Sequence, residues 1–324
     1  MAAELQIHGQ GHLGLSFETT IGDFVAPTKF LPIRSESLRW VEDKPYRMNI
    51  KGVADRQPPG TLGPGHVEGD VEFEVTADTL IYFLYAGRME PSRTGVGPYT
   101  YTFVPFHGPK PSTGASATVR KTLSILVARA NVGFGYAGCS VGSFNFSYEN
   151  EVLICSMSLM GLTEGTETIV SPTFDELTDL SFGPAHNSIK IPSDEAIRTD
   201  VADASLSIND GAEVRARLDG QQAPSGIRWG EREVTVSLEH DFESTADYDA
   251  FKASTRQDIE FLASRDASDN QIKATVRGTI TDTYESNLAS LGDLVAASVE
   301  YHGTYDDAEV YEIEVKTDED ILGS

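Results

Sequence analysis

Two overlapping glycine motifs near the middle of the chain have spacings that carry chemistry in other proteins. Residues 133–138, GFGYAG, match the G-x-G-x-x-G pattern of dinucleotide binding, and residues 138–142, GCSVG, match the G-x-S-x-G pattern that presents a nucleophilic serine. Both patterns require a helix directly after the glycines. Residues 143–148 instead alternate polar and apolar side chains, which predicts a strand. We therefore expect neither a bound dinucleotide nor a catalytic serine, and no enzyme.

The remaining candidate ligands do not form a metal site in the sequence. His8 and His12 are four residues apart, but their Gly-rich segment lacks a helical pattern that would place them on one face. Cys139 and Cys155 fall on neighbouring strands of one predicted hairpin, where we expect small buried thiols. The acidic runs at 306–307 and 318–320 are either loose cation sites or solvated surface, and we favour the second reading. No metal and no cofactor is expected.

The composition excludes several classes of partner. The 324 residues include 50 Asp and Glu against 25 Lys and Arg, for a net charge of -25. Such a surface repels the phosphates of nucleic acids and of anionic lipids. The chain has no apolar run long enough to span a bilayer and no visible signal peptide, so membrane insertion is not expected. Only 9 of the 25 basic residues are Lys. That balance favours adaptation to high salt over an ordinary acidic protein, because salt screens self-repulsion.

The hydrophobic pattern predicts a mainly β protein with two helices. Apolar and polar residues alternate over residues 67–75, 144–148 and 311–315, as in half-buried strands. One helix is expected over 76–86, with Thr76 as its N-cap and Gly87 at its end. A second helix is expected to begin near Ser244 and to continue through Ile259 and Phe261.

The same order of elements occurs twice along the chain. Ser37-Leu38 and Ser205-Leu206 each lead to a turn, a Gly/Pro loop, an alternating strand and a helix that opens Thr-Ala-Asp. This repeat predicts two tandem domains of one fold, residues 1–165 and 166–324, with the polar stretch 163–168 as linker. Residues 1–168 carry 17 acids and 13 bases, whereas residues 169–324 carry 33 and 12. The second domain is therefore the more acidic one.

Several segments resemble the tail tube proteins of long-tailed, siphovirus-type double-stranded DNA phages and archaeal tailed viruses. The opening GLSFETTIG at 14–22 is similar to their opening with E-T-x-x-G, and LPIRSESL at 31–38 resembles the strand that follows. GDVEFEV at 69–75 with the helix after it resembles their strand-into-helix unit. YAGCSV at 136–141 followed by FNFS at 144–147 resembles their hairpin entry. The resemblance spans nearly the whole chain.

The resemblance implies a mechanical function in the virion of a haloarchaeal virus. It implies two β-sandwich or barrel domains, each with a flanking helix, that join through their strands into rings around a lumen. The rings would stack into a non-contractile tail tube, assembled in the host cytoplasm, that conducts viral DNA during genome ejection without binding it. Six domains per ring would come from three chains, as a trimeric pseudo-hexamer. The implied partners are further copies of the chain and the tape-measure, terminator and tail-tip proteins.

Two sets of residues are candidates for these roles. A conduit must repel its cargo, so acids on one strand face are candidate lumen residues. They are Glu68, Asp70, Glu72 and Glu74, with Glu231, Glu233 and Glu239 as rough counterparts in the second half. The loop from Gly52 to Gly69 is a candidate for contact with the next ring through Arg56, Pro58, Pro59, Gly60, Leu62 and Pro64. The alternative interpretation is a tail-tip or cell-surface binding module with an adhesin-like sandwich.

Overall fold

The computed structural model describes residues 11–44, 63–107, 121–149, 152–174, 181–192, 196–217, 220–242, 245–266, 270–287, 296–305 and 309–322. The protein is mainly β, as predicted, with two α-helices among these residues. No helix in the described ranges is long and apolar enough to cross a membrane.

The first unit is built from two connected antiparallel layers. One layer runs β2–β1–β8–β9–β11, and the other runs β4–β5–β10–β9 with the short β3 also beside β5. The 18-residue strand β9 belongs to both layers, one with each half. The strands are β1 His12–Phe17, β2 Lys29–Leu31, β3 Ser35–Glu36, β4 Arg39–Glu42, β5 Gly65–Glu74, β8 Leu123–Arg129, β9 Val132–Glu149, β10 Val152–Gly161 and β11 Thr163–Glu167.

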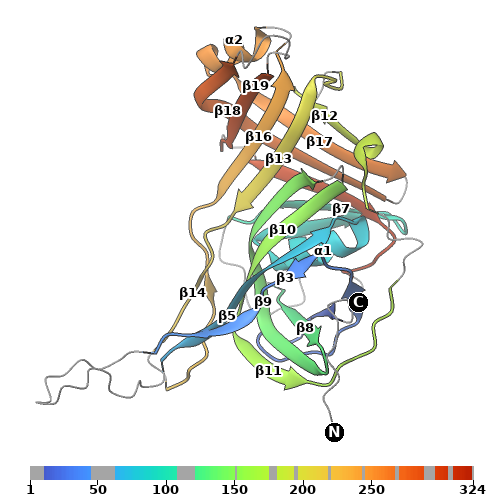
Figure 1. The fold of residues 1–324 in the computed structure, drawn as a ribbon, viewed down its shortest axis with the longest axis vertical. Coiled ribbons are helices and arrows are strands. Elements are labelled where there is room, and N and C mark those ends of the chain that lie inside the picture. Colours follow the sequence, from blue (N-terminus) through green and yellow to red (C-terminus); the bar gives the residue numbers. More distant parts are fainter. Residues whose placement is uncertain are drawn as a thin grey trace, which may run out of the picture.

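Helix α1 (Ala77–Ala86) follows β5 as the sequence predicts, with Thr76 as N-cap and Gly87 as C-cap. The Thr76 side chain makes no capping bond to the helix backbone; its hydroxyl lies 2.6 Å from that of Thr79. Eight of the ten helix residues are buried, so α1 lies inside the molecule (Figure 1). The hairpin of β6 (Met89–Thr94) and β7 (Tyr99–Pro105) follows it.

The second unit repeats the strand pairing of the first. One layer runs β12–β17–β18–β20 and the other runs β13–β16–β19–β18, with the long strand β18 shared as β9 is. The strands are β12 Asn187–Lys190, β13 Val201–Asn209, β16 Glu233–Asp241, β17 Arg256–Asp266, β18 Asn270–Asn287, β19 Ala296–Gly303 and β20 Tyr311–Thr317; β14 Glu213–Val214 and β15 Ile227–Arg228 form a separate pair after β13, and a 3-10 turn, Pro184–His186, precedes β12.

The two units are joined edge to edge by strand pairing. The second half of β9 pairs with β13, which makes one long sheet in the order β4–β5–β10–β9–β13–β16–β19–β18. Strand β20 pairs with β7 and so covers the first unit from the other side. A single hydrophobic cluster runs from Leu13 to Ile321 through both units. In Figure 1 the first unit forms the lower part of the molecule and the second unit the upper part.

Helix α2 (Ala246–Ala253) begins where the repeat predicts, but it is shorter than expected. The predicted continuation through Ile259 and Phe261 is wrong, because these residues belong to β17. Ser254 adopts a left-handed conformation with φ of 50°, which ends the helix. The two apolar residues are two positions apart, which is the spacing of a strand rather than of a helix.

Two further expectations require correction. The stretch 163–168 is not a free linker, because Thr163–Glu167 forms β11 and pairs with β9. The acidic run 318–320 is not simply a solvated surface. Glu319 pairs with Lys29, and Asp320 pairs with Arg93, so these carboxylates attach the end of the second unit to the first. The other acidic run, 306–307, lies outside the described residues.

Candidate functional site: the acidic face of the long sheet

The long sheet has one apolar and one polar face, and the polar face crosses both units. In β5 the side chains of Val67, Val71 and Phe73 are completely buried in the core. The alternate positions point away from the core, because successive residues of a strand face opposite sides. The four candidate acids occupy these positions: Glu68, Asp70, Glu72 and Glu74. Their predicted shared face is therefore seen in the structure, and their role stays a prediction.

The next strands continue this face with small polar side chains. Asp70 and Glu72 lie opposite Ser158 and Ser156 of β10. These two serines in turn lie opposite Ser143 and Asn145 of β9. The polar face continues across β9 and β13 to β16 through paired positions that hold Ser143, Asn145, Ser205, Ser207, Asn209, Thr235 and Ser237. The face between the two units is therefore mostly hydrophilic, with Ile154 and Met160 of β10 as apolar positions opposite Glu74 and Glu68.

The second unit contributes acids to the same face. Glu233 and Glu239 of β16 are exposed on it, as the sequence predicts, whereas Glu231 is exposed just before the strand begins. Three further acids on this face were not among the candidates: Asp203 of β13, Asp241 of β16 and Glu300 of β19. The period-two pattern of 201–209 was the available signal for Asp203. Only the strand pairing shows that these acids share a face with those of β5.

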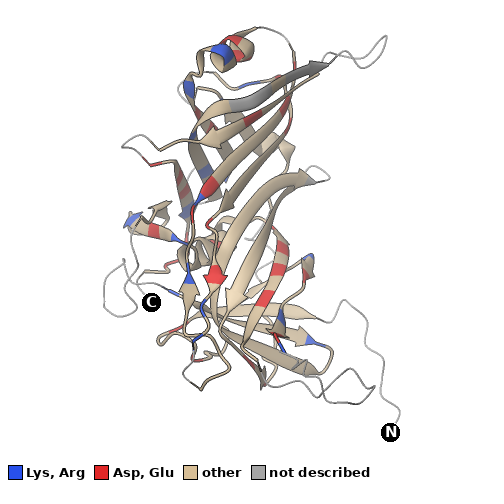
Figure 2. Ribbon diagram, turned by 90° about the vertical axis from the view of Figure 1, so that its left-hand side faces the viewer, with Lys and Arg blue, Asp and Glu red and all other residues tan. Residues whose placement is uncertain are grey.

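Basic residues are excluded from the centre of the long sheet. Its six central strands, β5, β10, β9, β13, β16 and β19, contain no Lys or Arg. They contain ten acids: four in β5, three in β16 and one each in β9, β13 and β19. Figure 2 shows β9 and β10 as long, almost entirely tan strands beside a strand with red bands. Because other strands hold Arg or Lys, this exclusion is a property of the central sheet.

Two of the β5 acids pair with arginines at the edge of the sheet, and Glu68 also lies 3.5 Å from His66 of β5 itself. Arg39 of β4 lies 3.0 Å from Glu68, and Arg34 lies 3.4 Å from Glu74. The hydrogen bond from Arg39 lowers the pKa of Glu68, with a smaller contribution from the charge of His66. These side chains are partly exposed to solvent, so the pairs contribute little to stability. The face therefore stays acidic at neutral pH.

The candidate ring-contact loop lies mostly outside the described residues. Of its named members only Pro64 is described: it is exposed, and its carbonyl accepts the N–H of Asp43 at 3.1 Å. Arg56, Pro58, Pro59, Gly60 and Leu62 lie outside those ranges. The start of β5 meets the connection between β14 and β15, because the N–H of Gly65 donates to the carbonyl of Gln222 at 3.0 Å. Figure 1 shows β14 beside β5 at the lower left.

The two glycine motifs have structural roles in β9. A strand, and no helix, follows them, so the geometry for a dinucleotide or a nucleophile elbow is missing. Gly138 has a φ of 69°, and a Cβ there would lie 2.6 Å from Leu162. Its N–H donates to Glu18 at 2.6 Å, and this buried carboxylate also accepts from Gly22, Thr122 and Ser124. The ETTIG opening and the YAGCSV segment thus meet around one carboxylate.

Neither cysteine nor metal chemistry is indicated by the described part of the chain. Cys139 and Cys155 are free and buried, as predicted, and burial raises the pKa of both thiols well above the ordinary value. Within the described residues, no three His, Cys, Asp or Glu side chains are placed to hold a metal ion. His8 lies outside them, and the Nε2 of His12 lies 2.9 Å from the carbonyl of Val170.

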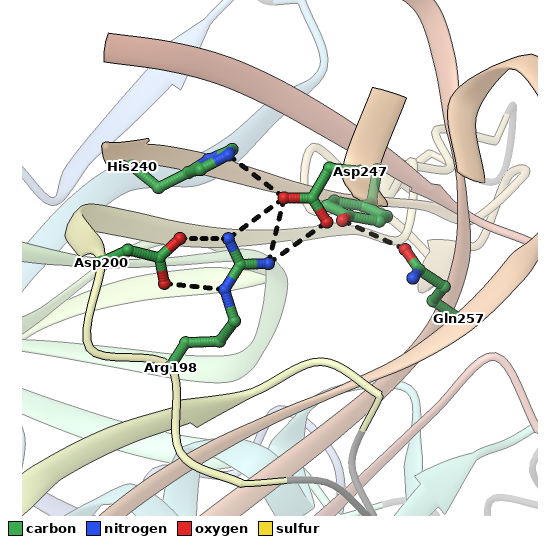
Figure 3. A network of polar contacts seen from close by, with 6 residues as sticks. Arg198, Asp200, His240, Asp247 and Gln257 are labelled. Carbon is green, nitrogen blue, oxygen red and sulfur yellow. Dashed lines mark hydrogen bonds and ion pairs between the residues drawn. The ribbon is translucent and has the colours of Figure 1, made fainter. Parts of the chain in front are cut away.

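One buried polar network positions α2 against the second unit (Figure 3). Asp247, the only buried residue of α2, accepts two bonds of 3.1 Å from Arg198 and lies 3.1 Å from Nε2 of His240. Arg198 also pairs with Asp200, with Nε 2.8 Å from Oδ1. The hydrogen bond from Arg198 lowers the pKa of Asp200. Burial would raise the pKa of Asp247, but His240 and Arg198 outweigh it and hold the pKa below its ordinary value.

The fold and the polar face together describe a β-rich protein with an extended acidic surface. The family model for the phage tail tube protein matches residues 10–303. The chain therefore belongs to the phage tail tube protein family, a family of structural virion proteins that assemble into tubes. A search of curated proteins finds no match.

Proposed function

We propose that this protein forms closed rings that stack into a non-contractile tail tube, with the acidic face of the long sheet lining the channel for DNA. The observation that carries this proposal is the absence of Lys and Arg from the six central strands, which hold ten acids. Central strands without Lys or Arg offer the DNA phosphates no cation that could displace their counterions, so the DNA stays mobile.

The ring is proposed to contain three chains. Each chain holds two units with the same strand pairing, so three chains supply six units around the axis. Negative-stain electron microscopy of the concentrated protein tests the assembly. We expect tubes or stacked rings. Protein that stays monomeric at every concentration and salt condition would contradict it and would favour a tail-tip or cell-surface binding module.

The position of the acidic face is tested by labelling assembled tubes. Glu72→Cys places a thiol on the acidic face, and Glu312→Cys places one on β20, outside the long sheet. The reagent is a polyethylene glycol maleimide too large to diffuse along the channel. We expect the Cys at position 72 to react in monomers and to be protected in tubes, while the control at 312 reacts in both. The two native thiols, Cys139 and Cys155, are buried and should not react with the reagent.

Equal labelling of the two positions in tubes would refute the lumen assignment while leaving the tube itself established. Loss of tubes in the Glu72→Cys variant alone is resolved by a cryo-EM map of wild-type tubes. Glu72 and Glu74 on the outer wall of that map would also refute the assignment.

We further infer that the protein works at high salt, as in a long-tailed virus of a halophilic archaeon. The support is the excess of 25 acids over bases and the scarcity of Lys. High salt screens the repulsion among these acids. We expect the unfolding midpoint and the length of tubes to rise between low and multimolar salt; a midpoint that does not change would contradict this inference.

A further inference from the structure

The joint between the two units shows which strand edges of this fold fit one another. The second half of β9 and β13 pair antiparallel, with Phe144 opposite Ile208 and Phe146 opposite Leu206. The N–H of Asp210 continues the ladder by donating to the carbonyl of Gly142 at 3.0 Å. The edge of one unit formed by β9 therefore accepts the edge of the other formed by β13.

The repeat supplies a second copy of each edge, and both copies are open. The end of β18 lies beside β19 as the second half of β9 lies beside β10, and β4 lies beside β5 as β13 lies beside β16. Within the described residues, 284–287 of β18 pair with β19 alone and β4 pairs with β5 alone. The long sheet therefore ends in the two complementary edges of the internal joint.

The equivalent positions on the β4 side follow from the pairing with β5 and β16. Trp40 lies opposite Val67, and Ile208 lies opposite Val234. Val67 lies opposite Gly161, the last residue of β10. Thr235 lies opposite His302, so the same register places Val234 opposite Gly303, the last residue of β19. The two valines are therefore equivalent. Trp40 thus occupies the place of Ile208, and the two are as far apart in the chain as Ser37 and Ser205 of the sequence repeat.

The equivalent positions on the β18 side follow in the same way. Tyr284 lies opposite Val299, and Phe144 lies opposite Met157. In each unit the long strand has a register shift just before this position. Tyr284 thus occupies the place of Phe144.

The backbone of β4 has the direction that such a joint requires. The N–H of Ser37 donates to Asp70 of β5 at 2.9 Å, and that of Asp43 donates to Pro64, just before β5, at 3.1 Å. Residues of an antiparallel strand alternate in the direction of their backbone groups, so Arg39 and Val41 also point to β5. The N–H and C=O of Trp40 then point away from β5, as those of Ile208 point to β9 in the internal joint.

We propose that β18 of one chain pairs antiparallel with β4 of the next chain, with Tyr284 opposite Trp40 of the partner. The joint would repeat the pairing of β9 with β13 and would continue the long sheet from chain to chain. It rests on the proposed ring and deepens it by naming the strands and the register. A head-to-tail contact of this kind closes into a ring, and closure covers both open edges.

The test is a disulfide between chains at a position that the register fixes. Position 39 of one chain would face position 285 of the next as a non-hydrogen-bonded pair, whose Cα atoms are about 4.5 Å apart and suit a disulfide. The variant Arg39→Cys with Glu285→Cys is oxidised after assembly and run on a non-reducing gel. We expect covalent dimers and trimers and no larger species, because the third disulfide closes the ring.

Two matched pairs serve as controls. Asn145→Cys with Ser207→Cys is the same pair in the internal joint, and it should form a disulfide within one chain even in monomers. Arg39→Cys with Asn287→Cys is shifted by one repeat of the strand, where the Cα atoms would be roughly 7–8 Å apart, and it should not cross-link.

The outcomes separate the register from the function. Tubes in which the 39/285 pair does not cross-link, or in which the 39/287 pair cross-links better, would refute the proposed joint and leave the tube function standing. A protein that forms neither rings nor tubes while the internal 145/207 control cross-links would refute the joint and the proposed function together.

Discussion

The network around Arg198 gives a sharp test of what holds α2 in place. The guanidinium joins two carboxylates, Asp200 and Asp247, whose side chains are 12% and 10% exposed, and its own side chain is 19% exposed. Asp247 is the only buried residue of α2, so this ionic contact attaches the helix to its sheet together with the packing of Tyr248 and Phe251 on Tyr284. Arg198→Met keeps the length of the side chain and removes its charge.

The expected loss can be sized from the geometry. Arg198 makes hydrogen bonds to both carboxylates, so the change leaves the part-buried Asp200 without this partner and the buried Asp247 with His240 alone. Removing one partner of a buried ion pair costs about 3–5 kcal/mol, since the other charge is left uncompensated. For a cooperative unit of 150–250 residues, 1 kcal/mol shifts the melting temperature by roughly 2–4 °C. We therefore expect a loss of roughly 6–20 °C.

Thermal unfolding measures this shift, and hydrogen exchange of α2 shows whether the helix is the part that is loosened. Arg228→Met is the matched control, because Arg228 lies 2.7 Å from Glu213 but the two side chains are 70% and 64% exposed. An exposed pair of this kind contributes about 0–1 kcal/mol. If Arg198→Met destabilised the protein no more than Arg228→Met, burial of the network would not be what holds α2, and the reasoning would be wrong.

Three further predictions follow from other contacts. Asp200 and Asp247 have lowered pKa values in the folded state. Their contribution to the stability of the fold is therefore complete above the ordinary pKa near 4 and is lost as the pH falls through the lowered values. The acid unfolding curve of wild type should be steeper than that of Asp247→Asn. Glu18→Ala strands four donors and should cost roughly 4 kcal/mol or more in urea unfolding, at about 1 kcal/mol or more per donor, and a loss below about 1 kcal/mol would contradict this account. Cys139 and Cys155 should react with Ellman's reagent at pH 8 only after denaturation, because burial raises the pKa of both thiols; rapid reaction of the native protein would show that they are accessible.

Much of the fold could be predicted from local patterns. The alternation over 67–75 and the Thr-Ala-Asp openings place β5 and both helices, because side-chain period and helix-start chemistry act within a few residues. The end of α2 was missed, although the spacing of Ile259 and Phe261 is that of a strand, because the left-handed residue that ends the helix is Ser254 and no glycine marks the position. The strand β11 was missed because a short polar edge strand has no apolar face to reveal it.

The candidate site was only half predictable for a different reason. The four acids of β5 share a face by period alone, so the sequence shows them directly. Asp203 and Glu300 lie on the same face only because β13, β16 and β19 pair in a particular order. Such pairings join segments far apart in the chain, and no local pattern encodes them. The contacts of Glu319 and Asp320 with Lys29 and Arg93 were missed for the same reason.

The structure also indicates that the two kinds of joint in the proposed ring are unequal. The internal joint has a second strand pairing, because the β6–β7 hairpin of the first unit accepts β20 of the second. The second unit has no hairpin at the equivalent place, since only Ser254 and Thr255 separate α2 from β17. The internal joint is also held by Lys29 with Glu319 and Arg93 with Asp320. A chain–chain joint built from β18 and β4 lacks this second layer of pairing. On the proposed assembly, a ring would therefore open between chains before its two units separate, so the chain is the unit that is added to and lost from the tube.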